Sequence, residues 1–139
     1  MEIPLRFRAR SKFEFRGSVI DSDVEVFKSR ADSAGDFRKA TTAPFLRCLG
    51  RWFREEAAKE QPGVRVVTAR LVSRPRLGEQ AARFRIVMEV PTAAGRVRVY
   101  VDLLAFQRGR TGVTLSFTGV AAPVRGQLEL GRAIAARTR

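Results

Sequence analysis

The chain has 139 residues, enough for one domain with its own hydrophobic core. Its composition, 45% hydrophobic and 29% charged, excludes a disordered chain, and the lack of histidine excludes Ser-His and Cys-His nucleophile pairs. With one cysteine there is no intrachain disulfide and no zinc site of cysteine and histidine, and no apolar stretch reaches transmembrane length. The formal net charge of +13 instead raises the question of polyanion binding.

The first third of the chain is expected to form strands and one short helix. Alternating apolar and basic residues predict one strand, or two short ones, over residues 3–15. Residues 19–28 alternate more weakly and carry Asp21, Asp23 and Glu25, which favours an edge strand protected by charge. Candidate caps at 32–36 then predict a short helix over residues 31–40.

A longer amphipathic helix is predicted over residues 43–59. Thr41 or Thr42 can cap it and Pro44 suits its first turn. One stripe of its surface is apolar, and this stripe is expected to lie on a sheet; it consists of Phe45, Cys48, Leu49, Trp52 and Phe53. A strand over 64–73 and a loop over 74–80 should follow.

Residues 82–118 read as three antiparallel strands in sequence. Apolar residues occupy the even positions from 82 to 90, the odd positions from 97 to 105, and positions 113, 115 and 117. We expect all three sets to share one apolar face. A C-terminal helix over 128–136, with Leu130, Ala133 and Ile134 facing inward, completes the chain.

The registers of the two hairpins follow from matching these apolar sets. Pairing Pro91 with Arg96 places Arg85 opposite Asp102 and Glu89 opposite Arg98, two attractive pairs on a polar face. The second hairpin is expected to have a three-residue loop, 108–110. The resulting fold class is α+β: a two-layer domain whose antiparallel sheet carries helices on one face, with sequential strand contacts within 64–118.

Basic residues concentrate in the second half of the chain. Residues 61–139 contain 14 arginines and four acidic residues. A contact surface for a polyanion is one interpretation, and a solvated face enriched in arginine by a GC-rich genome is the other. The candidate residues for binding a partner or ligand are Arg74, Arg76, Arg83, Arg98, Tyr100, Arg108 and Arg110.

Two side chains deserve a test as catalytic groups. Cys48 lies on the apolar helical stripe, which favours a buried small hydrophobic residue over a nucleophile. Asp102 is a carboxylate between apolar neighbours, and Arg85 opposite it already accounts for its presence. Trp52 and Tyr100 are expected in the core or along a ligand pocket. We therefore predict no catalytic residue, metal or cofactor.

Several short segments resemble a known group of proteins. They are Phe45-Leu46-Arg47-Cys48-Leu49, Leu77-Gly78-Glu79, Ala82-Arg83-Phe84-Arg85-Ile86, Tyr100-Val101-Asp102, Arg108-Gly109-Arg110 and Leu130-Gly131-Arg132-Ala133-Ile134-Ala135-Ala136-Arg137. With these segments the chain resembles uncharacterised actinobacterial secreted proteins and lipoproteins, which are similar to sensor-like extracellular domains of kinases and to PsbP-like folds. The resemblance covers roughly residues 13–139 and implies a PsbP-like sheet with packed helices.

These observations lead to one functional expectation with one alternative. We expect one α+β domain over residues 1–139, in which 1–12 is either integral or a peripheral or truncated segment. It should act as a non-catalytic, sensor-like module for an unknown protein or small ligand; the alternative is an arginine-rich domain that binds polyanions or nucleic acid. The sequence as given indicates the cytoplasm, whereas the resemblance implies an extracytoplasmic protein with a truncated N-terminus.

Overall fold

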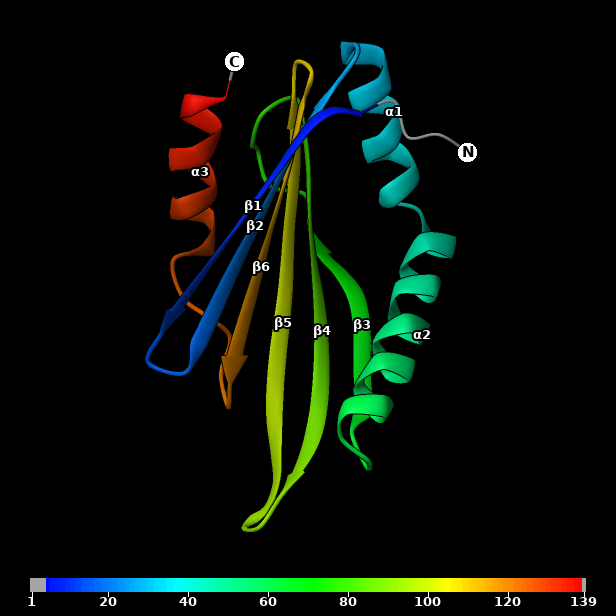
Figure 1. The fold of residues 1–139 in the computed structure, drawn as a ribbon, viewed down its shortest axis with the longest axis vertical. Coiled ribbons are helices and arrows are strands. Elements are labelled where there is room, and N and C mark those ends of the chain that lie inside the picture. The colour runs from blue at the N-terminus through cyan, green and yellow to red at the C-terminus, as the bar shows by residue number, and fades with distance from the viewer. Residues whose placement is uncertain (1–4, 139) are drawn as a thin grey trace.

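The computed structural model describes residues 5–138, with side chains from residue 7 onward, and shows an α+β domain (Figure 1). Within this range one antiparallel sheet of six strands is accompanied by three helices. In chain order the elements are β1 (Leu5–Phe15), β2 (Ser18–Phe27), α1 (Arg30–Ala40), α2 (Ala43–Glu60), β3 (Arg65–Ser73), β4 (Gln80–Thr92), β5 (Gly95–Arg108), β6 (Thr111–Val120) and α3 (Gln127–Arg137). These bounds agree closely with the predicted elements. The predicted strand at residues 3 and 4 lies outside the described residues.

The strands are ordered β1-β2-β6-β5-β4-β3 across the sheet. The sequential contacts predicted from β3 to β6 are therefore confirmed. The prediction of an edge strand at 19–28 is wrong, because β2 lies between β1 and β6 and pairs with both. Its acidic side chains do not repel neighbours, since Asp23 and Glu25 lie opposite Arg10 and Arg8 of β1.

The hairpin between β4 and β5 has the register expected from its side chains. Pro91 pairs with Arg96, Arg85 with Asp102, and Glu89 with Arg98. Pairing Pro91 with Arg96 implies a four-residue loop, 92–95, but Thr92 and Gly95 also pair and leave a two-residue turn. Apolar and charge patterns agreed here, and together they fixed the pairing.

The hairpin between β5 and β6 differs from its prediction by one residue. Arg108 pairs with Thr111, so the turn contains Gly109 and Arg110 alone. Gly109 has a φ of 57°, a conformation that glycine adopts without steric cost. Its N–H donates to Glu79 Oε1 (3.1 Å), and its carbonyl accepts from Gln107 Nε2 (2.8 Å). One contact from outside the hairpin, made by Glu79, and one from Gln107 of β5 thus accompany the shorter turn.

That one-residue difference reverses the orientation of β6, because side chains alternate between the two faces of a strand. Leu115 pairs with Leu104, whereas Phe84 pairs with Leu103 on the other face. The expectation that Phe84, Val101 and Leu115 share one face is therefore wrong. β5 carries apolar residues on both faces, the pattern of a strand covered on both sides.

Helices accordingly cover both faces of the sheet rather than one (Figure 1). α3 packs against β5 on one side, while α1 crosses β5, β6 and β2 and α2 follows β3 on the other. Each side has its own apolar cluster, one built around Leu104, Phe106, Leu115 and Phe117 and the other around Phe37, Ala82 and Phe84. The expected two-layer arrangement is replaced by helices on both sides, because β4 and β5 offer apolar side chains to each.

The side under α3 is tightly packed. Leu104 and Leu115 are completely buried, and Gly131 lets α3 approach so closely that an added Cβ would lie 2.8 Å from Leu104 Cδ2. Leu130 and Ile134 pack against this cluster as predicted, whereas Ala133 is exposed. Close packing of this kind leaves little space for a ligand.

The side under α2 is more open. Thr42 caps α2 and Pro44 lies in its first turn, as expected, but Gly50 is its only buried residue. Trp52 is 53% exposed, and Phe45 and Cys48 are exposed as well. The predicted seal between the apolar stripe and the sheet is therefore incomplete, because α2 lies over the edge strand β3 instead of the sheet centre.

Candidate ligand-binding groove

A groove lies on the face of the sheet that α1 and α2 share. Its volume is about 430 Å³, and we call it the tryptophan groove. α2 supplies one wall, β1 the other, and β2 and β6 the floor. The lining residues are Arg10, Ser11, Asp21, Ser22, Asp23, Trp52, Thr114 and Ser116.

Trp52 provides the apolar wall. Its ring meets Phe53 edge-on, with centroids 5.0 Å apart and planes at 86°, so the neighbouring aromatic side chain supports it. About half of the Trp52 side chain nevertheless remains exposed. An indole held in this way offers a rigid flat surface on which an apolar ligand face can stack.

The floor of the groove carries polar side chains without protein partners. Asp21, Thr114 and Ser116 point to the same face, since Asp21 pairs with Ser116 across β2 and β6. Within residues 7–138 none of these three side chains makes a hydrogen bond or ion pair with another residue. Lys12 lies opposite Asp21 on β1 but contacts Glu14 at 3.2 Å instead. One carboxylate and two hydroxyls are thus available to a ligand.

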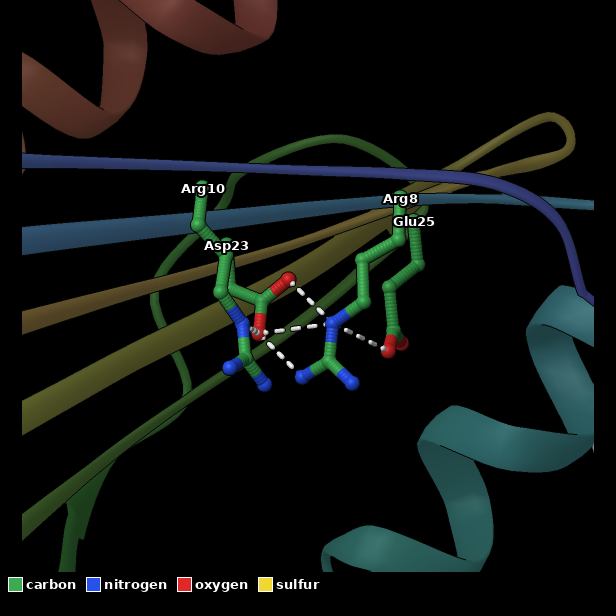
Figure 2. A network of polar contacts seen from close by, with 4 residues as sticks. All are labelled: Arg8, Arg10, Asp23 and Glu25. Atoms are coloured by element: carbon green, nitrogen blue, oxygen red, sulfur yellow. Dashed lines mark hydrogen bonds and ion pairs between the residues drawn. The ribbon is translucent and has the colours of Figure 1, made fainter.

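The β1 wall is a network of opposite charges, shown in Figure 2. Arg8 Nε donates to Asp23 Oδ1 at 2.9 Å, and Arg10 Nε donates to Asp23 Oδ2 at 3.1 Å. Arg8 Nε also lies 3.4 Å from Glu25 Oε1. The cross-strand register of β1 and β2 produces these contacts directly, and they fix the position of the groove wall.

The two carboxylates in this network have opposite pKa shifts. Hydrogen bonds from Arg8, and secondarily from Arg10, hold the pKa of Asp23 below its ordinary value despite partial burial. Burial raises the pKa of Glu25, although Arg8 opposes the change. Asp23 therefore remains ionised and keeps both arginines in place at neutral pH.

The sequence-predicted contact residues separate into three groups. Arg83, Arg98 and Tyr100 lie on the face of the sheet opposite the groove, and Arg74 and Arg76 lie in the loop between β3 and β4. The guanidinium of Arg108 donates to the carbonyl of Ala135, and that of Arg110 to the carbonyl of Phe27, each at 3.1 Å. Arg108 and Arg110 therefore bind backbone carbonyls, one in α3 and the other at the last residue of β2.

Arg83 and Arg98 belong to a larger basic area, here called the arginine surface. It extends over β3, β4 and β5 on the face that α3 shares, and the register brings Arg70 directly opposite Arg85. Its six arginines face two acidic residues, Glu89 and Asp102. The arginines are Arg65, Arg70, Arg83, Arg85, Arg96 and Arg98.

Asp102 is buried at the margin of this surface. Only 1% of the residue is exposed, and Arg85 donates to both of its oxygens at 2.7 and 2.9 Å. Gln127 Nε2 adds a third hydrogen bond of 2.6 Å from the start of α3. The pairing of Arg85 with Asp102 is confirmed. The expectation that this pair lies on a solvated face is wrong, because α3 and the chain leading into it cover this part of the face. Its hydrogen bonds account for Asp102 as a structural group.

Cys48 is exposed, so the expectation of a buried cysteine is wrong. It does not line the tryptophan groove.

The described residues also contain no cluster of three cysteine or acidic side chains that could hold a metal ion. None of the helices within residues 5–138 has the length and apolarity needed to cross a membrane.

Comparison with solved structures shows distant similarity to other proteins. The crystal structure of PA94 from Pseudomonas aeruginosa, a protein of unknown function, aligns with 94% of this chain and 78% of its own, at 11% sequence identity and a TM-score of 0.33. No protein-family model matches the chain, and no curated protein matches it significantly.

Sequence reasoning did not find the floor of the groove. From the sequence, Asp21 is expected to protect an edge strand by its charge, and Thr114 and Ser116 stand out only as the positions between the apolar residues 113, 115 and 117. Their common position depends on the pairing of β2 with β6, two strands that are distant in sequence. The apolar wall of the groove was weakly indicated in the sequence, because Trp52 was already a candidate for lining a ligand pocket.

Proposed function

We propose that this chain is a non-catalytic binding domain that holds a small ligand, or a segment of a partner protein, in the tryptophan groove. The main support is the half-exposed Trp52 across from three polar side chains that have no side-chain partner within residues 7–138. Binding sites typically combine an apolar surface with a few polar groups that fix orientation. A ligand with one apolar face and several hydroxyl or amide groups matches this combination.

The proposal includes a PsbP-like fold and a sensor-like role for the domain. The sequence resemblance implies a PsbP-like arrangement and a sensor-like role, and a groove between helix and sheet is a suitable place for such a module to receive its ligand. A catalytic role has less support, because Asp102 is fully engaged in hydrogen bonds and the chain has no histidine.

Trp52 is the sole tryptophan of the chain, so its fluorescence reports directly on the groove. The purified protein should be titrated with cell-wall glycan fragments, lipids and polyanions, following both Trp52 emission and thermal unfolding. We expect at least one glycan or amphipathic ligand to change the emission and raise Tm. Asp21→Ala and Ser116→Ala should weaken that response, whereas Ser73→Ala on the opposite face should not. If no ligand in the panel alters emission or Tm, the proposal fails.

A second candidate function is polyanion binding by the arginine surface. It is favoured by Arg70, which makes no ion pair within residues 7–138 and lies directly opposite Arg85. Binding of heparin or single-stranded DNA should weaken steeply as salt increases, and Arg70→Ala with Arg98→Ala should reduce the slope. Lys39→Ala combined with Lys59→Ala, in the last turns of α1 and α2, provides the matched loss of two charges elsewhere. Affinity that is independent of ionic strength would exclude this function.

A further inference from the structure

The outer edge of β1 is unusual for an exposed strand. β1 lies at the end of the sheet, pairs with β2 alone among the described strands, and is 11 residues long. Phe7, Phe13 and Phe15 lie on one of its faces and are 60%, 65% and 69% exposed. Long apolar edge strands readily pair with other chains, and proteins usually shorten or cover them. These three rings therefore indicate a surface that another strand covers.

A second copy of the same strand satisfies the geometry of this edge. If two β1 strands pair antiparallel around a twofold axis normal to the sheet, residue numbers of paired positions add up to twice that of the central residue. Odd positions then pair with odd positions, so each aromatic face continues into the aromatic face of the other copy. The contact is self-complementary and closes after two chains.

Centring the pair on Ser11 brings the aromatic side chains of the two copies together. Phe7 then lies opposite Phe15 of the second copy, and Ala9 lies opposite Phe13. Phe13 is also diagonal to Phe7 of the second copy, within reach of an aromatic side chain. Each end of the contact thereby gathers three phenylalanines from two chains, while the small residues Ala9 and Ser11 occupy the centre.

The same register suits the charged face. Arg8 lies opposite Glu14 of the second copy, and this attraction occurs twice. Arg10 lies opposite Lys12, but Arg10 already has Asp23 as an ion-pair partner. Centring on Arg10 instead would oppose Arg8 and Lys12, and centring on Lys12 would oppose two copies of Lys12 and leave Phe7 without an aromatic partner. Of these three registers, the one centred on Ser11 is the one that gives both Phe7 and Arg8 a favourable partner.

The net charge of the protein does not prevent this contact. On the even-numbered face of β1 from residue 8 to residue 14, and at the facing positions of β2, three basic residues meet four acidic ones. The basic residues are Arg8, Arg10 and Lys12, and the acidic ones are Glu14, Asp21, Asp23 and Glu25. This region is close to neutral in a chain of +13, so two copies can approach along this edge with little repulsion.

We propose that β1 pairs antiparallel with β1 of a second copy, centred on Ser11, so that two sheets join into one continuous sheet. Because the twofold axis is normal to the sheet, the tryptophan grooves of both copies open on the same side. Pairing of this edge does not depend on what the grooves bind. It gives the exposed phenylalanines an apolar environment and the free backbone groups of β1 hydrogen-bond partners.

Sedimentation of the full chain tests the assembly. The weight-average mass should rise from 15.5 kDa towards twice that value as concentration increases to about 1 mM, a range that detects even weak association. Phe13→Asp combined with Phe15→Asp should keep the protein monomeric, and Val67→Asp on the opposite edge strand should not. Circular dichroism confirms that each variant is folded. A wild-type protein that stays monomeric throughout would overturn the proposal.

Cysteine trapping tests the register. In a Cys48→Ser background, which removes the exposed native thiol, Ser11→Cys places two thiols directly opposite each other, at a Cα separation that a disulfide accepts. Oxidation should then yield a covalent dimer. Ala9→Cys and Phe13→Cys should not cross-link separately but should do so when mixed. Efficient cross-linking of Phe13→Cys with itself, or none in the mixture, would contradict the register.

Charge reversal provides an independent check. Glu14→Arg places an arginine opposite Arg8 at both symmetry-related contacts of the dimer. This repulsion should weaken dimerisation at least tenfold at low salt. Combining it with Arg8→Glu should restore the attraction and recover most of that loss. Failure of the double variant to recover, with its fold intact by circular dichroism, would also contradict the register.

Discussion

The two faces of the sheet use similar side chains for different purposes. Under α3, fully buried leucine and phenylalanine residues surround a hydrogen-bonded Asp102, and Gly131 brings helix and strand into close contact. Under α2, Gly50 is the only buried helical residue and half of Trp52 is exposed. The difference indicates that α3 packs more closely on its face than α2 does on the other, and that the space beside α2 is available to a ligand. Substitutions in matched pairs can test this division.

The largest effect is expected at Asp102. Asp102→Ala leaves the partly buried guanidinium of Arg85 and the amide of Gln127 without their acceptor, and should cost about 3–5 kcal/mol of unfolding free energy. Chemical denaturation monitored by circular dichroism measures the loss. The control is Glu89→Ala, which removes the surface ion pairs to Arg65 and Arg98 and should cost much less. Equal losses in both variants would contradict the assignment of Asp102 to the core.

Leucine and tryptophan truncations compare the two apolar layers directly. Leu104→Ala creates a cavity in the layer under α3 and should cost about 3 kcal/mol. Trp52→Ala removes a larger side chain but should cost only about 1 kcal/mol, because much of the indole is in water already. Denaturant titration of both variants gives the comparison. A greater loss for Trp52→Ala would show that α2 seals the core after all.

Replacing each of two helical glycines with alanine should change the stability by smaller amounts, and the direction of the change should differ between them. Gly131→Ala places a Cβ 2.8 Å from a fully buried leucine and should destabilise the protein by about 1–2 kcal/mol. Gly50→Ala places its Cβ 3.3 Å from Ala69 Cβ, where α2 can shift, and should be neutral or stabilising by up to about 1 kcal/mol through helix propensity. Thermal unfolding distinguishes the signs. Destabilisation by Gly50→Ala equal to that of Gly131→Ala would indicate equally tight packing.

The smallest effect concerns pH and the wall of the groove. Since the folded state lowers the pKa of Asp23, this carboxylate contributes stability above its ordinary value of 3.8, and the contribution disappears as pH falls through the lower folded pKa. Asp23→Asn should therefore cost about 1 kcal/mol or less at pH 7, and the difference should vanish in strong acid. Glu25, whose pKa burial raises, acts in the opposite sense, and Asp23→Asn reduces this opposing effect because the Asp23 charge also raises the pKa of Glu25. A difference that is constant with pH would contradict this assignment.

Most of the local structure was predictable because its causes are local. The helix starting at Thr42 follows from a cap and a proline in the first turn, and the pairing of Arg85 with Asp102 follows from two side-chain patterns that agree. The candidate site was less predictable. Of the groove residues, the sequence singled out only Trp52 as a possible pocket residue, while Arg108 and Arg110 proved to bind backbone carbonyls.

The sequence by itself determined which segments are helices and strands, because capping, periodicity and hairpin pairing act between residues that are close along the chain. Only the tertiary structure decided the orientation of β6. Because β5 is apolar on both sides, two registers were equally compatible with its pattern, and contacts from Glu79 and Gln107 to the turn at Gly109 accompany the one adopted. The same long-range pairing placed β2 beside β6, gathered Asp21 and Ser116 beneath Trp52, and left the aromatic edge of β1 exposed.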